Sequence, residues 1–250
     1  MRLDRDHSIT DNEIEHGKKL SQQGAEFIWG WGSPAGKVRA EKRAALIAEG
    51  ACLRPGIRVL EIGCGTGLFT QMFVQTGAYI IAVDISPDLL REARMRGLPE
   101  DSVEFLEKPF EECKVDGPFD AVIGSSILHH LDLEVSLAKI YSLLKPGGIM
   151  SFAEPNMLNP QIFIQKNIHW IKKRMGDSPD ETAFVRLSLM RQLQSAGFTN
   201  ITITPFDWLH PATPERMIGT VSKIGGFLEA IPLIKEISGS LYIRCEKPQP

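Results

Sequence analysis

The sequence has 250 residues, is 43% hydrophobic and carries a net charge of −3. This length fits one domain, or one domain with an added lid, and the composition is ample for a single core. The sequence lacks the basic excess that would favour nucleic acid as a partner. No apolar run approaches the roughly 20 residues that a membrane span needs.

The cysteines and the N-terminus indicate the cellular compartment in which the protein is expected. The four cysteines are far apart and form no C-x-x-C pair, which indicates reduced thiols rather than disulfides or a zinc site. The segment from Met1 to Asp6 is charged and lacks an apolar core, so we expect no signal peptide. These features together predict a cytoplasmic protein with no resident metal.

The N-terminal part carries large aromatic side chains in an irregular segment. Trp29 and Trp31 stand among glycines and a proline, which predicts a loop rather than a regular helix. The next helix is predicted from Val38 to about Ala51. Arg39 and Arg43 lie at its start. They could bind an acidic acceptor, but we favour a position at the surface, where charged side chains usually lie.

A glycine-rich stretch follows that helix. The apolar run 59–62 predicts a buried strand, and Gly63, Gly65 and Gly67 come directly after it. From Leu68 the apolar residues recur at helical spacing, so the pattern is strand, glycine turn, helix. Such a turn lets a ligand approach the backbone. A dinucleotide fingerprint would need glycine at position 68, where this chain has leucine, and this speaks against a nucleotide-dependent oxidoreductase.

The next apolar run, 78–83, predicts a second buried strand that ends at Asp84. This acid comes 21 residues after Gly63, a spacing that suits hydrogen bonding to the two hydroxyls of a ribose. The alternative is that Asp84 caps the helix that begins at Pro87, a role for which Ser86 is a good rival. We favour the ribose interpretation because spacing and context agree.

Strands and helices continue to alternate through the rest of the chain. This alternation predicts a doubly wound α/β fold with a mostly parallel sheet of about seven strands. Ser125 and Ser126 follow the fourth strand, on the edge where such sheets bind ligands. The further strands are predicted at 103–106, 119–124, 149–153, 201–203 and 240–245.

Several motifs in order resemble those of class I S-adenosylmethionine (SAM) dependent methyltransferases of the small-molecule, type 11-like group. The resemblance covers roughly residues 40 to 155, and it implies a Rossmann-like sheet whose last strand is antiparallel and lies beside the sixth. The motifs are Glu61–Gly67, Ala82–Ser86, Phe119–Val122, Ile127–Leu131 and Leu144–Gly148.

The resemblance implies SAM as cofactor, with S-adenosylhomocysteine as product. One departure stands out: Pro109 occupies the position where the family commonly has an acid or amide beside the adenine, which leaves Phe110 as a candidate, or Glu107 or Glu111 as a substitute. The cofactor-binding residues that the resemblance implies are Glu61, Gly63, Gly65, Asp84, Ile85, Phe110, Ser125 and Leu128.

The same resemblance implies where the methyl acceptor lies. His129 and His130 are the candidates for a general base, because an imidazole suits proton removal from an oxygen or nitrogen nucleophile. The alternative is that one of them only caps a helix or anchors the loop. Trp29 and Trp31 are predicted to wall the acceptor site, or else to pack on the core. Glu154, after the fifth strand, is predicted to face the acceptor.

The C-terminal half departs from the motifs. Residues 217–237 have an amphipathic helical pattern with breaks at Gly225-Gly226 and Pro232. This pattern favours a helix that covers the sheet or walls an apolar pocket over one that meets a lipid surface. We expect one domain, made of a cap at 1–37, a SAM-binding core at 38–155, a lid at 156–183 and C-terminal strands with the amphipathic helix at 184–250.

The sequence therefore predicts a SAM-dependent methyltransferase that acts on an oxygen, nitrogen or carbon atom of a small molecule. It leaves the acceptor and the oligomeric state open. Two alternatives remain: a SAM-binding regulatory protein without turnover, and a methyltransferase that acts on a lipid-linked substrate at a membrane surface.

Overall fold

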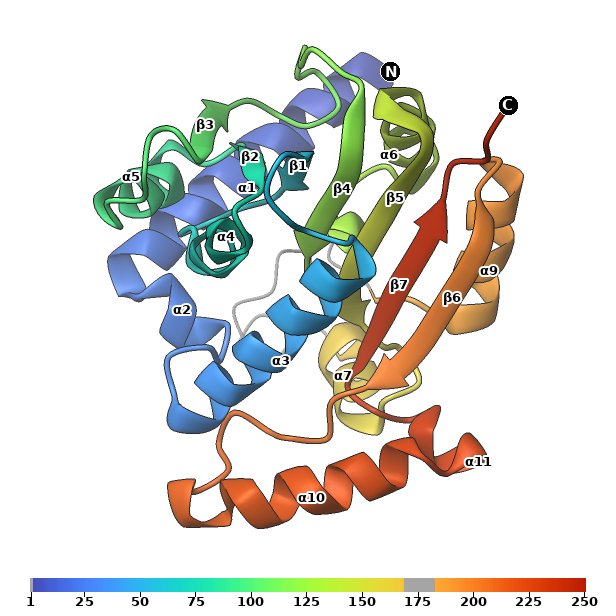
Figure 1. Cartoon of the computed structure of the whole chain (residues 1–250). Helices are drawn as coiled ribbons and strands as arrows, with labels where there is room; N and C mark the ends of the chain where they lie inside the picture. Colours follow the sequence, from blue (N-terminus) through green and yellow to red (C-terminus); the bar gives the residue numbers. More distant parts are fainter. Residues whose placement is uncertain (1, 169–182) are drawn as a thin grey trace.

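The chain folds around one seven-stranded sheet. The computed structural model describes residues 2–168 and 183–250, with side chains from residue 13 onward (Figure 1). The strand order is β3-β2-β1-β4-β5-β7-β6, and only β7 runs antiparallel to its neighbours. The strands are β1 (Arg58–Ile62), β2 (Tyr79–Asp84), β3 (Val103–Glu107), β4 (Phe119–Ser125), β5 (Leu144–Pro155), β6 (Thr199–Phe206) and β7 (Ser240–Glu246).

Helices cover both faces of the sheet. The main ones are α1 (Arg2–Gln23), α2 (Ala25–Ile28), α3 (Pro34–Gly50), α4 (Leu68–Phe73), α5 (Pro87–Met95), α6 (Leu133–Leu143), α7 (Pro160–Asn167), α9 (Arg186–Ser195), α10 (Ile218–Glu229) and α11 (Pro232–Lys235). The short 3-10 turns are η1 (Val74–Thr76), η2 (Leu128–His130) and η3 (Glu215–Met217).

Each face of the sheet has its own hydrophobic core, because successive side chains of a strand point to alternate faces. Leu60 of β1 packs with residues of α6 and α9, whereas its neighbour Val59 packs with residues of α3, α4 and α5. Successive side chains of a strand point to opposite faces, so a strand that is apolar at every position is buried on both. This confirms the predicted doubly wound α/β fold, including the antiparallel last strand paired beside the sixth.

The local predictions differ from the structure at two places. Residues 145–148, whose Lys-Pro-Gly-Gly sequence predicts a turn, lie inside β5. There the register against β4 shifts between Phe119 and Ala121, and Gly147 has a positive φ of 75°. Helix α3 begins at Pro34 rather than Val38. The Oγ of Ser33 accepts a hydrogen bond from the N–H of Gly36 (3.0 Å), and proline suits the first helical position.

The predicted break at Gly225-Gly226 is wrong, because α10 continues through both glycines. A Cβ on Gly225 would lie 3.0 Å from the Cβ of Trp208, so glycine lets the helix approach this side chain closely. The break at Pro232 is confirmed, since α11 begins there as a separate turn. Helix α10 lies at the bottom of Figure 1, beneath α3, and does not cover the sheet.

Candidate active site

The glycine turn at the end of β1 has the geometry that the sequence predicted. Gly63, Gly65 and Gly67 all have positive φ, of 68°, 53° and 74°. A Cβ on Gly63 would lie 2.4 Å from Cγ1 of Ile127, and a Cβ on Gly67 would lie 2.9 Å from that of Ala93. Backbone conformation and close packing therefore both require glycine here.

Asp84 reaches back to this turn from the end of β2. Its carboxylate accepts hydrogen bonds from the N–H of Gly65 (2.7 Å) and the N–H of Ser86 (2.9 Å). Burial raises the pKa of Asp84, while these backbone N–H groups act in the opposite direction. The cap of α5 is Ser86, which accepts from the N–H of Leu89. The competing capping role of Asp84 therefore falls to Ser86.

Glu61 lies inside β1, just before the glycine turn. Its side chain is only 2% exposed, and within the part of the chain that the structure describes its Oε2 has no hydrogen-bond partner. Burial raises the pKa of Glu61 from 4.5 to about 8; the nearby hydroxyl of Thr70 opposes the shift and the charge of Asp84 adds to it. An acid held this way can accept a positive charge that enters the crevice.

The two histidines follow β4 on η2. His129 is buried, and its Nδ1 lies 2.6 Å from Oε2 of Glu154, at the end of β5. The other carboxylate oxygen of Glu154 accepts from the N–H groups of Ile127 (2.9 Å) and Leu128 (3.0 Å). Glu154 is fully buried and already engaged through both oxygens, so the predicted contact between Glu154 and the acceptor is wrong. Instead this residue orients His129 and the loop around it.

His130 stands beside His129, with ring centroids 4.3 Å apart. Its Nδ1 lies 3.5 Å from Oε2 of Glu13 on α1. Further along α1, two residues contact α5 and its N-cap. Gly17 packs against Ser86, and Ser21 donates a 2.5 Å hydrogen bond to Glu92. Helix α1 thus passes over the carboxyl ends of β4, β1 and β2. His130 therefore faces this helix, although within the described residues its Nδ1 has no hydrogen-bond partner.

The segment after α1 is tied to the glycine turn. Glu26 accepts a 2.8 Å hydrogen bond from Oγ1 of Thr66 and forms an ion pair with Arg96. These contacts hold α2 against the turn, and a Cβ on Gly65 would lie 3.2 Å from the ring of Trp29. Trp29 therefore borders the cofactor crevice. The sequence carried no signal for this network, because residues 26 and 66 are distant in the chain.

Trp31 is a core side chain rather than an exposed wall. It is 8% exposed and meets Phe69 edge to face at 5.5 Å. The guanidinium groups of Arg39 and Arg43 lie 5.1 and 5.3 Å from its ring centroid. Of the two open interpretations, packing on the core is the one that this placement favours.

The prediction that Arg43 lies at the surface is wrong. Its side chain is 3% exposed and donates to the Oγ of Ser126 (3.0 Å), the carbonyl of Ala153 (3.0 Å) and the Oγ of Ser240 (2.5 Å). Burial lowers the pKa of Arg43 to about 10. Because α3 begins earlier than predicted, Arg43 falls in mid-helix on the face toward the sheet. There it joins β4, β5 and β7 at their ligand-bearing edge, with Ser125 3.4 Å away.

A lysine of α6 holds the loop that follows β3. Lys139 Nζ donates to the carbonyls of Phe110 (2.7 Å), Glu111 (3.2 Å) and Cys113 (2.5 Å), and burial lowers the pKa of Lys139. The ring of Phe110 is 4% exposed and packs in the core. We therefore expect Phe110 to meet a cofactor through its backbone. Ile85 is half-buried directly after Asp84.

The described residues contain neither a metal-binding cluster nor a membrane-spanning helix. Within residues 2–168 and 183–250, no group of three or more His, Cys, Asp or Glu side chains is arranged to hold a metal ion. No helix in the same ranges combines the length and apolar character needed to cross a bilayer.

Comparison with known proteins identifies the domain. Residues 60–152 match the family model described as a methyltransferase domain. A ubiquinone biosynthesis O-methyltransferase from Xanthomonas campestris pv. campestris is 34% identical over 123 residues, which are 48% of this chain and 49% of that protein. The chain thus spans about half the length of the curated relatives it matches.

Solved structures show the same fold over most of the chain. The N-methyltransferase NodS from Bradyrhizobium japonicum, with S-adenosylhomocysteine, is similar with a TM-score of 0.58 and 14% identity over 87% of this chain and 90% of that one. A Haemonchus contortus phosphoethanolamine N-methyltransferase, with phosphomonomethylethanolamine and S-adenosylhomocysteine, is similar with a TM-score of 0.62 and 18% sequence identity. This match covers 88% of this chain and 56% of that one. Residues 60–152 therefore match a methyltransferase domain, and most of the chain has the fold of SAM-dependent methyltransferases, in agreement with the recognition made from the motifs.

The residues present fit SAM. Gly63, Gly65 and Gly67 let the turn adopt positive φ, the backbone conformation with which glycine turns approach a ligand. Glu61 offers a buried oxygen that lacks a partner among the described residues, which suits the cationic methionine end of the cofactor. Asp84 stands at the end of β2, where its carboxylate can exchange a backbone N–H for ribose hydroxyls.

We expect Asp84→Ala to weaken SAM binding by at least about 1 kcal/mol, because charge-assisted hydrogen bonds to the ribose are lost. Calorimetric titration measures this directly. Asp88→Ala, on the first turn of α5, is the matched control and should leave the affinity unchanged. Unaltered affinity in a folded Asp84→Ala protein would remove the ribose assignment.

Proposed function

We propose that this protein is a SAM-dependent methyltransferase that methylates a hydroxyl oxygen of a small molecule. The observation that carries the choice of oxygen is the buried pair of His129 and Glu154, whose atoms lie 2.6 Å apart. A hydroxyl must lose its proton as it attacks, and a histidine oriented by a carboxylate is suited to take it. The name of the curated relatives, O-methyltransferase, favours the same atom.

The roles of the residues follow from this pairing. A carboxylate only accepts hydrogen bonds, so Glu154 keeps the proton of the neutral imidazole on Nδ1 and the basic lone pair on Nε2. His129 Nε2 takes the proton of the acceptor hydroxyl, and Glu154 stabilises the imidazolium that results. SAM supplies an activated methyl group on a positively charged sulfur.

The remaining residues position the reactants and exclude water. Helix α1 and Trp29 cover the crevice, and we propose that residues 1–37 act as a cap on the SAM-binding core at 38–155. The proposed lid at 156–183 includes 169–182, which lie outside the described residues. We propose Glu61, Gly63, Gly65 and Asp84 as cofactor contacts, with Ser125 and Leu128 near the methionine end.

The proposal is tested with the purified protein in two steps. Titration with SAM and with S-adenosylhomocysteine should show binding of both. A labelled-methyl assay then compares acceptors in matched pairs that differ only in a hydroxyl or an amine at the same carbon. We expect label on the hydroxyl compounds. Transfer to the amine members alone would overturn the choice of oxygen, and binding without any transfer would favour the regulatory alternative.

A further inference from the structure

Helices α10 and α11 expose an unusual amount of apolar surface. Phe227 is 67% exposed, Leu233 85% and Ile224 54%. A helix that is apolar on all sides is normally buried, yet within α10 only Gly225 is fully buried. We call this surface the α10–α11 face; it consists of Met217, Ile224, Phe227, Leu233, Ile234 and Ile237.

The opposite side of α10 makes the contact with the rest of the protein. Ser222, Gly225 and Glu229, which recur at helical spacing, line a small hollow of about 50 Å³ shared with α3. Small and polar residues thus face the protein, whereas Ile224 and Phe227 face outward. The hydrophobic effect within this chain does not explain an arrangement that leaves these two side chains in water.

The charged side chains of residues 207–239 are also divided between the two sides: the acids face the protein and the cations do not pair with its described residues. Asp207 pairs with Arg39 at 2.7 Å, Glu229 with Lys42 at 2.8 Å and Glu236 with Arg186 at 2.9 Å. These pairs neutralise the acids on the protein side. By contrast, no ion pair within the described residues involves the cations Arg216, Lys223 and Lys235, and Glu215 is the one acid of 207–239 without such a pair.

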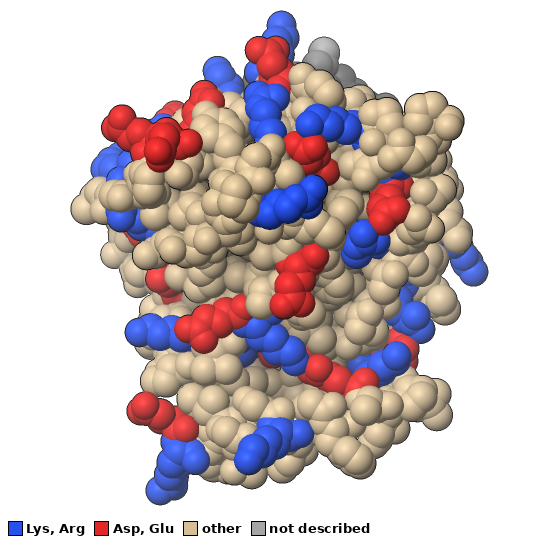
Figure 2. Space-filling model, in the orientation of Figure 1, with Lys and Arg blue, Asp and Glu red and all other residues tan. Residues whose placement is uncertain are grey.

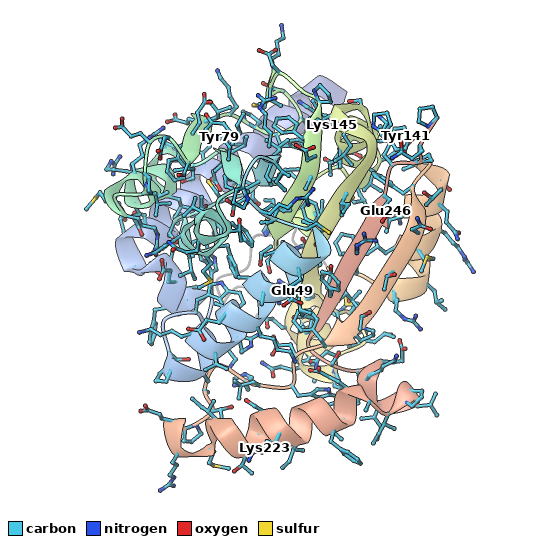
Figure 3. The ribbon with its side chains drawn as sticks, in the orientation of Figure 1. Glu49, Tyr79, Tyr141, Lys145, Lys223 and Glu246 are labelled. Carbon is cyan, nitrogen blue, oxygen red and sulfur yellow. The ribbon has the colours of Figure 1, made fainter. Side chains whose placement is uncertain are left out.

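Figure 2 shows the result as a lower region with few charged side chains, most of them basic. Lys223 lies on α10 at the bottom of Figure 3. The α10–α11 face therefore joins apolar side chains to a positive fringe, although the chain as a whole carries a net charge of −3.

The face lies at the ligand-bearing edge of the sheet. In Figure 1 the arrow of β6 points down toward α10. Strands β4 and β5 run in the same direction, because β5 and β6 are both antiparallel to β7. The carboxyl ends of these three strands therefore lie on the side of α10, and Lys145, near the start of β5, is at the top of Figure 3. Asn156, two residues after Glu154, donates from Nδ2 to the carbonyls of Glu236 and Ser238, both at 2.8 Å. The face is thus connected to the strand that positions His129.

Helix α7 extends the apolar surface. Asn159, which caps α7, donates from Nδ2 to the carbonyl of Ile237 (2.9 Å) just after α11. Phe163 and Ile164 of α7 are 54% and 46% exposed. Apolar side chains on two neighbouring helices therefore lie at the same edge of the molecule.

We propose that the α10–α11 face docks onto a bilayer surface that carries anionic lipids. An interfacial helix buries its apolar side at the boundary of the acyl chains, and its lysines and arginines meet the lipid phosphates. The face does not suit a second copy of this chain, because a twofold interface would bring the same cations against each other. An acceptor carried by the membrane would then enter at the edge where β4 and β5 end, a conclusion that rests on the proposed methyl transfer.

Vesicle sedimentation of the whole protein, without SAM, tests the docking. The probes are phosphatidylcholine vesicles with and without phosphatidylglycerol. We expect the wild type to bind the vesicles that contain phosphatidylglycerol. The double variant Phe227→Asp/Leu233→Asp should bind them about tenfold more weakly, or weaker still. Lys223→Glu/Lys235→Glu should lower binding to the anionic vesicles only, because the apolar contact remains. Met95→Asp, at a 79% exposed apolar residue on α5, is the matched control and should bind as the wild type.

Each outcome decides the proposal. Wild-type protein that stays in the supernatant with both vesicles overturns it, as does equal partition of the wild type and the folded Phe227→Asp/Leu233→Asp variant. A wild type that forms dimers but does not bind vesicles, together with a Phe227→Asp/Leu233→Asp variant that is monomeric, would assign the face to a second copy instead. The assay contains no SAM, so its result is independent of methyl transfer, which is measured separately on a water-soluble acceptor.

Discussion

Replacing Glu154 by glutamine is expected to lower the rate of methyl transfer by about 10²- to 10⁴-fold, while the affinity for SAM stays near that of the wild type. The amide oxygen can still accept from the N–H groups of Ile127 and Leu128, so the loop keeps its shape. The amide nitrogen, however, donates toward Nδ1 of His129 and forces the proton onto Nε2. His129 then lacks the lone pair with which it would take the acceptor proton.

The measurement is a pH–rate profile beside a SAM titration. A general base must be unprotonated to act, so the rate of the wild type should fall toward acid pH, and the residual rate of Glu154→Gln should lack this acid limb. Glu134→Gln, at an exposed residue of α6, is the control. A variant with normal rate, or one whose only defect is weak SAM binding, would refute the role of Glu154 as a positioning residue.

Replacing Glu61 by glutamine is expected to stabilise the ligand-free protein at alkaline pH. Burial raises the pKa of Glu61 from 4.5 to about 8, so between these values the folded protein holds a proton that the unfolded chain has released. Wild-type stability therefore falls as the pH rises through this window. At about 1.4 kcal/mol per pH unit, the loss has an upper limit of about 5 kcal/mol.

Denaturant unfolding at two pH values measures this effect. Glutamine does not ionise, so Glu61→Gln should match the wild type near pH 5 and exceed it by at least about 1 kcal/mol at pH 8. Glu41→Gln, at an exposed position on α3, is the control and should change neither value. The same pH dependence in Glu61→Gln and the wild type would contradict the assignment of the loss to Glu61.

The same substitution should weaken SAM binding. The cofactor is cationic at its methionine end, and its entry favours the charged form of Glu61, so the wild type should release a proton on binding near pH 7. Titrations in two buffers of different ionisation enthalpy detect this proton. Glu61→Gln should bind more weakly and release none. Equal proton release in both proteins would show that another group titrates.

The sequence by itself determined the SAM-binding part of the protein, from β1 to the end of β2. The apolar runs before Gly63 and Asp84 predicted β1 and β2, because strands covered on both faces must be apolar at successive positions. Three glycines at alternate positions predicted a turn that only glycine can adopt, and the structure has positive φ at each. Local rules sufficed here because each element is specified by its own residues.

Only the tertiary structure decided what the charged and aromatic side chains contact. Arg43 was expected at the surface and is buried, and Glu154 was expected to face the acceptor and holds His129. Helix α10 was expected to cover the sheet or to wall an apolar pocket, and its apolar side chains Ile224 and Phe227 are exposed. In each case the partner comes from a distant part of the chain. Burial and pairing depend on such distant contacts, which local periodicity does not encode.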